Sequence, residues 1–454
     1  MMALAHKLDT NRERHVQPVP GGRQGGGKWL VVALLSLMFA MSLLDRMILG
    51  ILANPVGQAL RLADSELGLL MGTGFAVLYS VASLPMAHAI DSANRKRMVI
   101  FGVTLWSVMT IVSGFATDFT QLLLARSGVA IGEAVLTPAA VSLIADLFAK
   151  DQRRVPMTIF TSVGAIMATA AFALGGLALA LGGMLTSRLG LAPWRLTFII
   201  VGIPGLLLTL SFLIFVREPA RSGGAEQAEE AGFLAFLDYT RKHWWFYVPL
   251  FASSGAFCLF NYSMFSWMPT IMVRAHGYQP ADAGFIFGFV MTPIQLAAIY
   301  FWPRLAMRVE RSGTNKGVPL ALFCAALLAL PLYVIAPLMT NKYLFIGGLS
   351  LTLVSAAAWA VLPTIGFQLF SPKRMVGRLS ALNLLVMNLV GYGLGPVLTV
   401  YFGQAWRHVD VPAHWGLATD SLARGLATNG LIAAPIMIVC TWICLKTAHR
   451  LGTR

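Results

Sequence analysis

The sequence is poor in charged residues. Only 12% of its 454 residues are charged and 57% are hydrophobic, whereas about a quarter of a soluble globular chain is charged. The 19 acidic and 34 basic residues are crowded into short segments between long apolar runs. This pattern excludes a soluble enzyme with an ordinary polar surface, and it excludes a disordered chain. Strands that alternate polar and apolar residues are also lacking, which excludes a transmembrane β-barrel. A bundle of membrane-spanning helices remains.

Cysteine is scarce as well. The four cysteines all lie inside apolar runs, so we predict no disulfide and no metal site. The net charge of +15 does not indicate nucleic acid as a partner. Basic residues recur in small groups between apolar runs rather than forming one continuous stripe, which is typical of membrane proteins.

Twelve apolar runs are long enough to cross a bilayer, since a spanning helix needs about 20 apolar residues. The sequence therefore predicts an all-α membrane protein with twelve transmembrane helices. The predicted spans are Trp29–Ala53, Leu67–Ala89, Met98–Ala116, Phe119–Phe148, Pro156–Met184, Leu196–Val216, Phe246–Val273, Ala283–Met307, Val318–Leu338, Tyr343–Leu369, Leu379–Phe402 and Leu422–Leu445.

The distribution of Lys and Arg predicts the orientation. If the N-terminus is cytoplasmic, the cytoplasmic segments hold 25 basic residues and the external loops hold 7. Basic residues favour the cytoplasmic loops of membrane proteins. We therefore expect both termini to be cytoplasmic, in a multi-pass protein of the cell (inner) membrane.

A long segment between the sixth and seventh spans divides the chain into two halves of six spans. Basic segments recur at similar places in both halves, after the second span and after the fourth. Two pseudo-symmetric six-helix bundles are the architecture of an alternating-access carrier. The linker either contains a short interfacial helix or is plain connecting chain. The predicted organisation is a cytoplasmic tail (1–28), an N-terminal bundle (29–216), a cytoplasmic linker (217–245), a C-terminal bundle (246–447) and a second tail (448–454).

Four ionisable residues lie inside the predicted spans, away from their ends: Asp45, Arg46, Arg126 and Glu133. Charge inside a bilayer is costly and usually functional. At 1.5 Å per residue, the first three are expected at one level of the outer half, and Glu133 about two turns deeper. Arg126 and Glu133 are seven residues apart and share a helix face, whereas Asp45 and Arg46 point about 100° apart.

These four residues suggest a coupling site. We hypothesise that Glu133, with Asp45 as a second candidate, carries a proton, because desolvation favours the neutral acid. Arg46 or Arg126 would then hold an anionic group of the substrate. The alternative is that the four charges only neutralise one another and hold two spans together. Neutral polar residues of other spans are further candidates for substrate binding: Tyr79, Asn261 and Asn388.

A family resemblance enters at the second predicted loop. The segment Ala87-His-Ala-Ile-Asp91-Ser-Ala-Asn-Arg95-Lys96-Arg97 resembles the loop signature of the major facilitator superfamily, Gly-x-x-x-Asp-Arg-x-Gly-Arg-Arg. The acid and the basic trio match, while Ala87, Ser92 and Asn94 depart from the pattern. The resemblance implies that this loop acts as a cytoplasmic gate, formed by Asp91, Arg95, Lys96 and Arg97.

Other segments narrow the resemblance to the spinster-like branch. They are Leu44-Asp45-Arg46, the stretch from Arg126 to Ala134 with Pro138, Trp194-Arg195, Gly202-Ile-Pro204-Gly205 and the glycine-rich stretch from Asn388 to Pro396. That branch implies export of lysolipids or sphingosine-type lipids, with proton coupling through Asp45 and Glu133 and an arginine at Arg46. The anion–cation symporter group shares the Asp-Arg and Gly-Glu segments and carries small organic anions.

The sequence thus predicts a proton-coupled secondary transporter that acts as a monomer and needs no cofactor beyond protons. The first substrate class is an amphipathic anionic lipid, such as a lysophospholipid or a sphingosine-phosphate-like molecule. The alternative is a small organic anion, either a carboxylate or a sugar acid. A membrane-embedded lipid-modifying enzyme is the remote alternative, because no span combines a nucleophile with a base or holds a metal-ligand set.

Overall fold

The computed structural model describes residues 24–149, 151–219, 233–311, 315–406 and 417–450. Within these ranges, twelve helices are long and apolar enough to cross a membrane. The prediction of an all-α protein with twelve spans is therefore confirmed. Most of the predicted N-terminal tail, the middle of the predicted linker and residues 451–454 lie outside the described residues.

The first six spans form the N-terminal bundle, and two of them are broken rather than continuous. They are α1 (Gln24–Leu60), α2 (Asp64–Met71) followed by α3 (Thr73–Ser92), α4 (Arg95–Ser113), α5 (Phe119–Glu133) followed by α6 (Leu136–Leu147), α7 (Arg154–Leu189) and α8 (Pro193–Phe215).

The C-terminal bundle follows the short amphipathic helix α9 (Phe233–Lys242), which lies within the predicted linker. Two of its spans contain a π-helical segment, labelled η. The spans are α10 (Trp244–His276), α11 (Pro280–Phe285) with η1 (Ile286–Val290) and α12 (Met291–Glu310), α13 (Gly317–Ile335) with the 3-10 turn η2 (Ala336–Leu338), α14 (Lys342–Phe370), α15 (Lys373–Val386) with η3 (Met387–Leu394) and α16 (Gly395–Ala405), and α17 (Ser421–Thr447), which ends in the 3-10 turn η6 (Ala448–Arg450).

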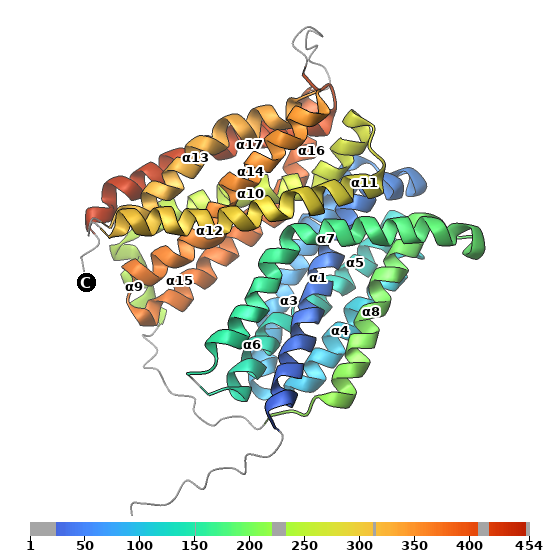
Figure 1. The fold of residues 1–454 in the computed structure, drawn as a ribbon, viewed down its shortest axis with the longest axis horizontal. Coiled ribbons are helices and arrows are strands. Elements are labelled where there is room, and N and C mark those ends of the chain that lie inside the picture. The colour runs from blue at the N-terminus through green and yellow to red at the C-terminus, as the bar shows by residue number, and fades with distance from the viewer. Residues whose placement is uncertain (1–23, 150, 220–232, 312–314, 407–416, 451–454) are drawn as a thin grey trace, which may run out of the picture.

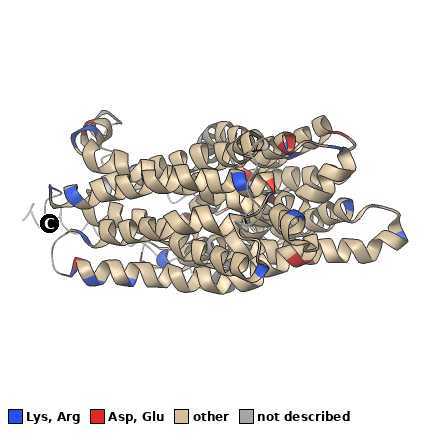
Figure 2. Cartoon of the chain, turned by 90° about the horizontal axis from the view of Figure 1, so that it is seen from above, with Lys and Arg blue, Asp and Glu red and all other residues tan. Residues whose placement is uncertain are grey.

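Several spans begin directly after a short polar residue that caps the helix. The side chains of Asn94, Asp118, Asn341 and Asp420 each accept a hydrogen bond from a backbone N–H of the helix that they precede. Such caps satisfy N–H groups that have no partner inside the helix. Figure 2 shows charged residues at several helix ends and long stretches of helix without charge.

The two bundles meet at one end and diverge at the other (Figure 1). We call one end of the molecule the linker side; it carries α9, the first residues of α1 and the last residues of α17. We call the opposite end the loop side. Because the number of spans is even, α1 begins and α17 ends on the linker side. Contacts between the bundles join α1 to α10, α7 to α11 and η1, and α2 to α16.

Close backbone approaches hold the two bundles together toward the loop side. A Cβ atom at Gly50 of α1 would lie 3.1 Å from the carbonyl oxygen of Phe265 in α10. A Cβ at Gly176 of α7 would lie only 2.7 Å from the carbonyl oxygen of Ala281 in α11. Small residues let membrane helices approach this closely. The described structure is therefore a conformation that is closed on the loop side.

An ion pair joins the bundles at the loop-side surface. Arg274, near the end of α10, donates two hydrogen bonds of 2.9 Å to the two carboxylate oxygens of Asp64, at the start of α2. Its Nε lies 3.3 Å from Oδ1 of Asn54 in α1. Asp420 faces the same guanidinium, and burial raises the pKa of its carboxyl. We call the Asp64–Arg274 pair the loop-side latch.

Replacing Asp64 with asparagine is expected to favour opening of the loop side. The paired side chains are 31% (Arg274) and 14% (Asp64) exposed, so the pair stabilises closure by about 1 kcal/mol or less. Spin labels at the exposed positions Ala63 and Thr419 report the separation of the bundles. In Asp64→Asn we expect the population with the longer distance to rise about two- to fivefold.

Asp118→Asn is the matched control for the latch. It makes the same carboxylate-to-amide change on the loop side, but Asp118 caps α5 within the N-terminal bundle, and asparagine caps a helix equally well. Equal distance distributions in the two variants would show that the Asp64–Arg274 pair does not hold the loop side closed.

Candidate functional site

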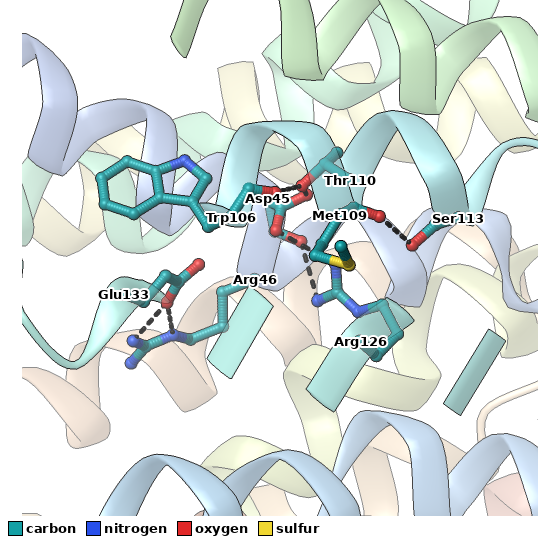
Figure 3. Close-up of polar contacts among 8 residues, drawn as sticks. All are labelled: Asp45, Arg46, Trp106, Met109, Thr110, Ser113, Arg126 and Glu133. Atoms are coloured by element: carbon teal, nitrogen blue, oxygen red, sulfur yellow. Dashed lines mark hydrogen bonds and ion pairs between the residues drawn. The ribbon is translucent and has the colours of Figure 1, made fainter. Parts of the chain in front are cut away.

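The four ionisable residues of the N-terminal spans form two ion pairs, and each pair links α1 to α5 (Figure 3). Asp45 pairs with Arg126, and Arg46 pairs with Glu133. Consecutive residues of a helix point about 100° apart, so Asp45 and Arg46 reach different partners. Depth along the spans predicted that Arg46 lies at the level of Arg126 and that Glu133 lies deeper. It therefore did not predict that Arg46 pairs with Glu133.

The Asp45–Arg126 pair is buried and fully hydrogen-bonded at the carboxylate. Arg126 Nη1 donates to Asp45 Oδ2 over 3.0 Å, and Arg126 Nη2 donates to the Asp45 carbonyl oxygen over 3.2 Å. The hydroxyl of Thr110 in α4 donates to the other carboxylate oxygen over 2.9 Å. Both side chains are only 3% exposed. This arrangement is that of a structural ion pair.

The carboxylate of the Arg46–Glu133 pair is less completely hydrogen-bonded than that of Asp45–Arg126. Nε and Nη2 of Arg46 donate to the same oxygen, Oε2 of Glu133, over 3.2 Å and 2.7 Å. The second oxygen, Oε1, is buried and has no hydrogen-bond partner among the described residues. The Arg46 side chain is 16% exposed, whereas that of Glu133 is fully buried. A buried carboxylate oxygen without a donor is costly. In the Asp45–Arg126 pair the buried atom without a partner among the described residues is Nε of Arg126, not a carboxylate oxygen, so Glu133 is the acid better suited to take up a proton.

The backbone around Glu133 explains its position. Gly102 of α4 and Gly132 of α5 touch, since a Cβ at Gly132 would lie 2.6 Å from the Gly102 carbonyl oxygen. Glu133 is the last residue of α5, and α6 begins at Leu136. Pro138 has no backbone N–H, so it cannot donate the helical hydrogen bond to the residue four positions earlier, within this break. The glutamate therefore projects from an interrupted span that is packed closely on its neighbour.

Aromatic rings surround the Arg46 guanidinium. Its central carbon lies 5.2 Å and 4.8 Å from the ring centroids of Phe75 and Tyr79 in α3. It also lies 5.8 Å from the ring of Tyr392, which belongs to η3 in the other bundle. Cations within about 6 Å of a ring centroid are attracted by the ring's negative face. We call these three rings the aromatic cage.

A small cavity of about 10 Å³ lies beside Arg46, between the bundles. This is close to the smallest volume that holds one water molecule. In this conformation the cavity holds no more than about one water molecule. The cavity is lined by Arg46, Met47, Gly50, Met71, Tyr262, Phe265, Ser266 and Tyr392.

The predicted substrate-binding residues fall into two groups. Arg46 and Tyr79 lie together at the cage, whereas Arg126 is engaged by Asp45. Asn261 and Asn388 are half-buried on the expected helices, but their neighbours Tyr262 and Tyr392 line the cavity instead. The aromatic cage was not predicted, although the Phe75 and Tyr79 spacing of one helical turn is visible in the sequence.

The predicted gate residues lie at the linker side of the N-terminal bundle. Arg95 is buried and bonds to Asp146 and Glu218, and Lys96 Nζ donates to the Leu213 carbonyl oxygen over 2.8 Å. These partners all belong to the N-terminal bundle or its end. Arg97 is exposed, and its N–H is capped by Asn94. The side chain of Asp91 lies outside the described residues.

Two bundles of six spanning helices, with buried ion pairs beside a cavity at their interface, define a membrane transporter. A family model described as the Major Facilitator Superfamily matches residues 34–396. The chain belongs to this superfamily. The resemblance found in its sequence motifs is thereby confirmed, and so is the prediction that the protein is a transporter rather than an enzyme.

Individual relatives agree with this assignment. The chain is 26% identical to an MFS-type efflux pump of Mycolicibacterium smegmatis, over 99% of this chain and 98% of the relative. It is 24% identical to protein spinster homolog 1 of Xenopus laevis, over 91% of this chain and 77% of that protein. It is also 31% identical to a probable L-galactonate transporter of Escherichia coli, over 41% of this chain and 39% of that protein.

Solved structures support the same fold. A crystal structure of a bacterial homologue of the human lysosomal transporter Spinster, in an inward-facing and unoccupied conformation, matches with a TM-score of 0.78. The identity is 22%, over 94% of this chain and 98% of that one. This match shows that the two proteins share one fold.

Proposed function

We propose that the protein is a proton-coupled transporter of an anionic substrate, in which Glu133 carries the proton and Arg46 binds the anion. The observation that carries this proposal is the incomplete Arg46–Glu133 pair beside the cavity between the bundles. Asp45 is the less suitable proton carrier, because both of its carboxylate oxygens accept hydrogen bonds.

Proton binding and anion binding are coupled because Glu133 and the anionic group of the substrate compete for the guanidinium of Arg46. When Glu133 takes up a proton, it loses its attraction for Arg46, and an anionic group of the substrate takes its place. The local net charge is then the same as in the empty site, because the added proton offsets the added negative charge. Uncompensated charge is costly in the low-dielectric interior of a membrane protein. Because Glu133 takes up a single proton, we infer one proton bound for each singly charged anionic group that Arg46 binds.

The first proposed substrate class is an amphipathic anionic lipid, such as a lysophospholipid. Two observations support it. Spinster homologues match over most of this chain. The four charged residues that lie away from the ends of the spans, Asp45, Arg46, Arg126 and Glu133, all belong to the N-terminal bundle, which leaves aromatic and neutral residues to face an acyl chain.

A small organic anion is the second candidate. The 31% identity to a probable L-galactonate transporter over part of the chain favours it. A ligand-induced thermal shift distinguishes the two classes. Stabilisation by lysophosphatidylglycerol but not by L-galactonate supports the lipid class, and the reverse result supports the small anion.

Replacing Glu133 with glutamine is expected to abolish pH-driven uptake while leaving substrate binding and exchange largely intact. Glutamine resembles the protonated acid in shape and charge, so Arg46 stays free to bind the anion at every pH. In the wild type, anion affinity falls as the pH rises through the deprotonation of Glu133. The slope is at most about tenfold per pH unit for one linked proton.

Proteoliposomes with and without an imposed pH gradient supply the measurement. Uptake against the gradient and exchange at equal pH are recorded for wild type and for Glu133→Gln. Thr137→Ser, a conservative change near the same helix break, is the control for nonspecific damage. Uptake by Glu133→Gln that still responds to the pH gradient would contradict the role of Glu133.

We also propose how the protein is oriented in the membrane. The linker side is assigned to the cytoplasm, because 25 basic residues belong to segments of that side against 7 on the loop side. The described conformation, which is closed on the loop side, is then inward-facing. The transporter would work as a monomer in the inner membrane.

A further inference from the structure

We infer that Tyr392 is a positioning residue of the anion site: its ring, supplied by the C-terminal bundle, covers the Arg46 guanidinium and holds it for the substrate. The inference rests on the proposed function of Arg46 and extends it to an uncharged residue of the C-terminal bundle. It concerns the ring of Tyr392 and not its hydroxyl.

The first support is the geometry of the aromatic cage. Phe75 and Tyr79 come from α3 of the same bundle as Arg46, and their rings are stacked with centroids 6.0 Å apart. Tyr392 approaches from the other bundle, with its ring 5.5 Å from that of Phe75 and 5.8 Å from the guanidinium. Among the described residues, it is the ring of the C-terminal bundle that lies over Arg46.

The second support is that Tyr392 is held in place by its surroundings. Tyr262 of α10 packs edge-on against it, with centroids 4.8 Å apart. The next residue, Gly393, accepts a hydrogen bond of 2.5 Å from the hydroxyl of Thr73, at the start of α3. Tyr392 is 7% exposed. Its ring therefore has a fixed position relative to α3 in this conformation.

The third support is the backbone of this segment. Tyr392 lies in the π-helical segment η3, Met387–Leu394, and such segments are frequent at functional sites. The segment lies against α3 and between α15 and α16. When the bundles separate on the loop side, Tyr392 moves with the C-terminal bundle while Phe75 and Tyr79 stay with Arg46. The cage is thus complete only in the loop-side-closed state.

A consequence follows for the substrate. The cavity beside Arg46 is bordered by the rings of Tyr262, Phe265 and Tyr392. An anion bound there has its charged end on the guanidinium, and the carbon atoms next to that end lie against aromatic faces. We therefore expect organic carboxylates or phosphate monoesters to bind, and fully hydrated inorganic anions to bind poorly.

Three substitutions at Tyr392 test the role of the ring. Tyr392→Phe keeps the ring and is expected to keep KM within about twofold of wild type. Tyr392→Ala is expected to raise KM roughly 10-fold, because a desolvated cation–ring contact is lost, with kcat within about twofold. Tyr392→Leu fills the space without a π-system and is expected to raise KM as Tyr392→Ala does. It therefore tests the role of the ring even if the alanine variant fails to fold.

Uptake of lysophosphatidylglycerol and of L-galactonate is measured for each variant, with thermal unfolding as a check on folding. Tyr401→Ala is the matched control, since Tyr401 belongs to the same bundle and is 65% exposed. A KM for Tyr392→Phe that matches Tyr392→Ala would overturn the role of the ring, and so would a Tyr392→Leu variant equal to wild type.

Arg46→Gln separates this inference from the proposed function. If Arg46→Gln loses uptake while Tyr392→Ala matches wild type, the role of Tyr392 is wrong and the anion site stands. If Arg46→Gln transports like wild type, the anion site itself is wrong and the inference falls with it. Loss in Arg46→Gln together with a raised KM in Tyr392→Ala supports both.

Discussion

Arg46→Lys is expected to reduce kcat/KM for uptake by at least roughly 100-fold, although lysine keeps the positive charge. Arg46 places Nε and Nη2 on one oxygen of Glu133, and its central carbon lies within 5.8 Å of three ring centroids. Lysine supplies a point charge without the fork or the planar face. Losing one or two charge-assisted hydrogen bonds of about 1.5–3 kcal/mol each accounts for this factor.

The fold should tolerate this change. The ammonium of lysine still neutralises Glu133, so we expect the free energy of unfolding to change by less than about 1 kcal/mol. Uptake in proteoliposomes and thermal unfolding in detergent are the two measurements. If Arg46→Lys lowers stability and uptake in parallel, Arg46 is a structural residue and not the anion-binding group.

The fold class was predictable from the sequence because a bilayer imposes simple rules. Spanning helices must be long and apolar, and most charged residues lie at their ends. Twelve spans, and the few charged residues inside them, can therefore be recognised from the sequence alone. Asp45, Arg46, Arg126 and Glu133 were found in this way, since nothing else in the spans carries charge away from the ends.

The pairing of those charges was not predictable. Depth along a straight helix placed Arg46 level with Arg126, but each arginine side chain is long, and the rotation of α1 relative to α5 decides its partner. The hydropathy pattern predicts two continuous helices where the structure has breaks, one at Gly72 and one after Glu133. Partner choice therefore depends on helix packing, which a single sequence does not specify.

The aromatic cage illustrates the same limit. Phe75 and Tyr79 lie one turn apart on α3, whose first residue, Thr73, bonds to the carbonyl oxygen of Gly393, 320 positions later in the chain. Their meeting with Tyr392 is set by how the two bundles close on the loop side. Asn261 and Asn388 were chosen on the correct helices for their polarity, but the cavity is bordered by their aromatic neighbours.

Asp45→Asn is expected to destabilise the fold by about 3–5 kcal/mol, the largest stability effect in the site. Arg126 is buried, and asparagine leaves its guanidinium without a charged partner. Glu133→Gln makes the same chemical change at the second pair. It should cost less, because Arg46 is partly exposed and is also held by three rings.

A double substitution tests the origin of this cost. In Asp45→Asn/Arg126→Gln the buried charge is gone, so we expect most of the lost stability to return. Unfolding midpoints of the wild type, both single variants and the double variant form a complete cycle. The two single losses would simply add if Asp45 and Arg126 acted independently, and that result would contradict a structural ion pair. A double variant that is stable and still shows pH-driven uptake would leave Arg46 and Glu133 as the groups that couple proton and anion.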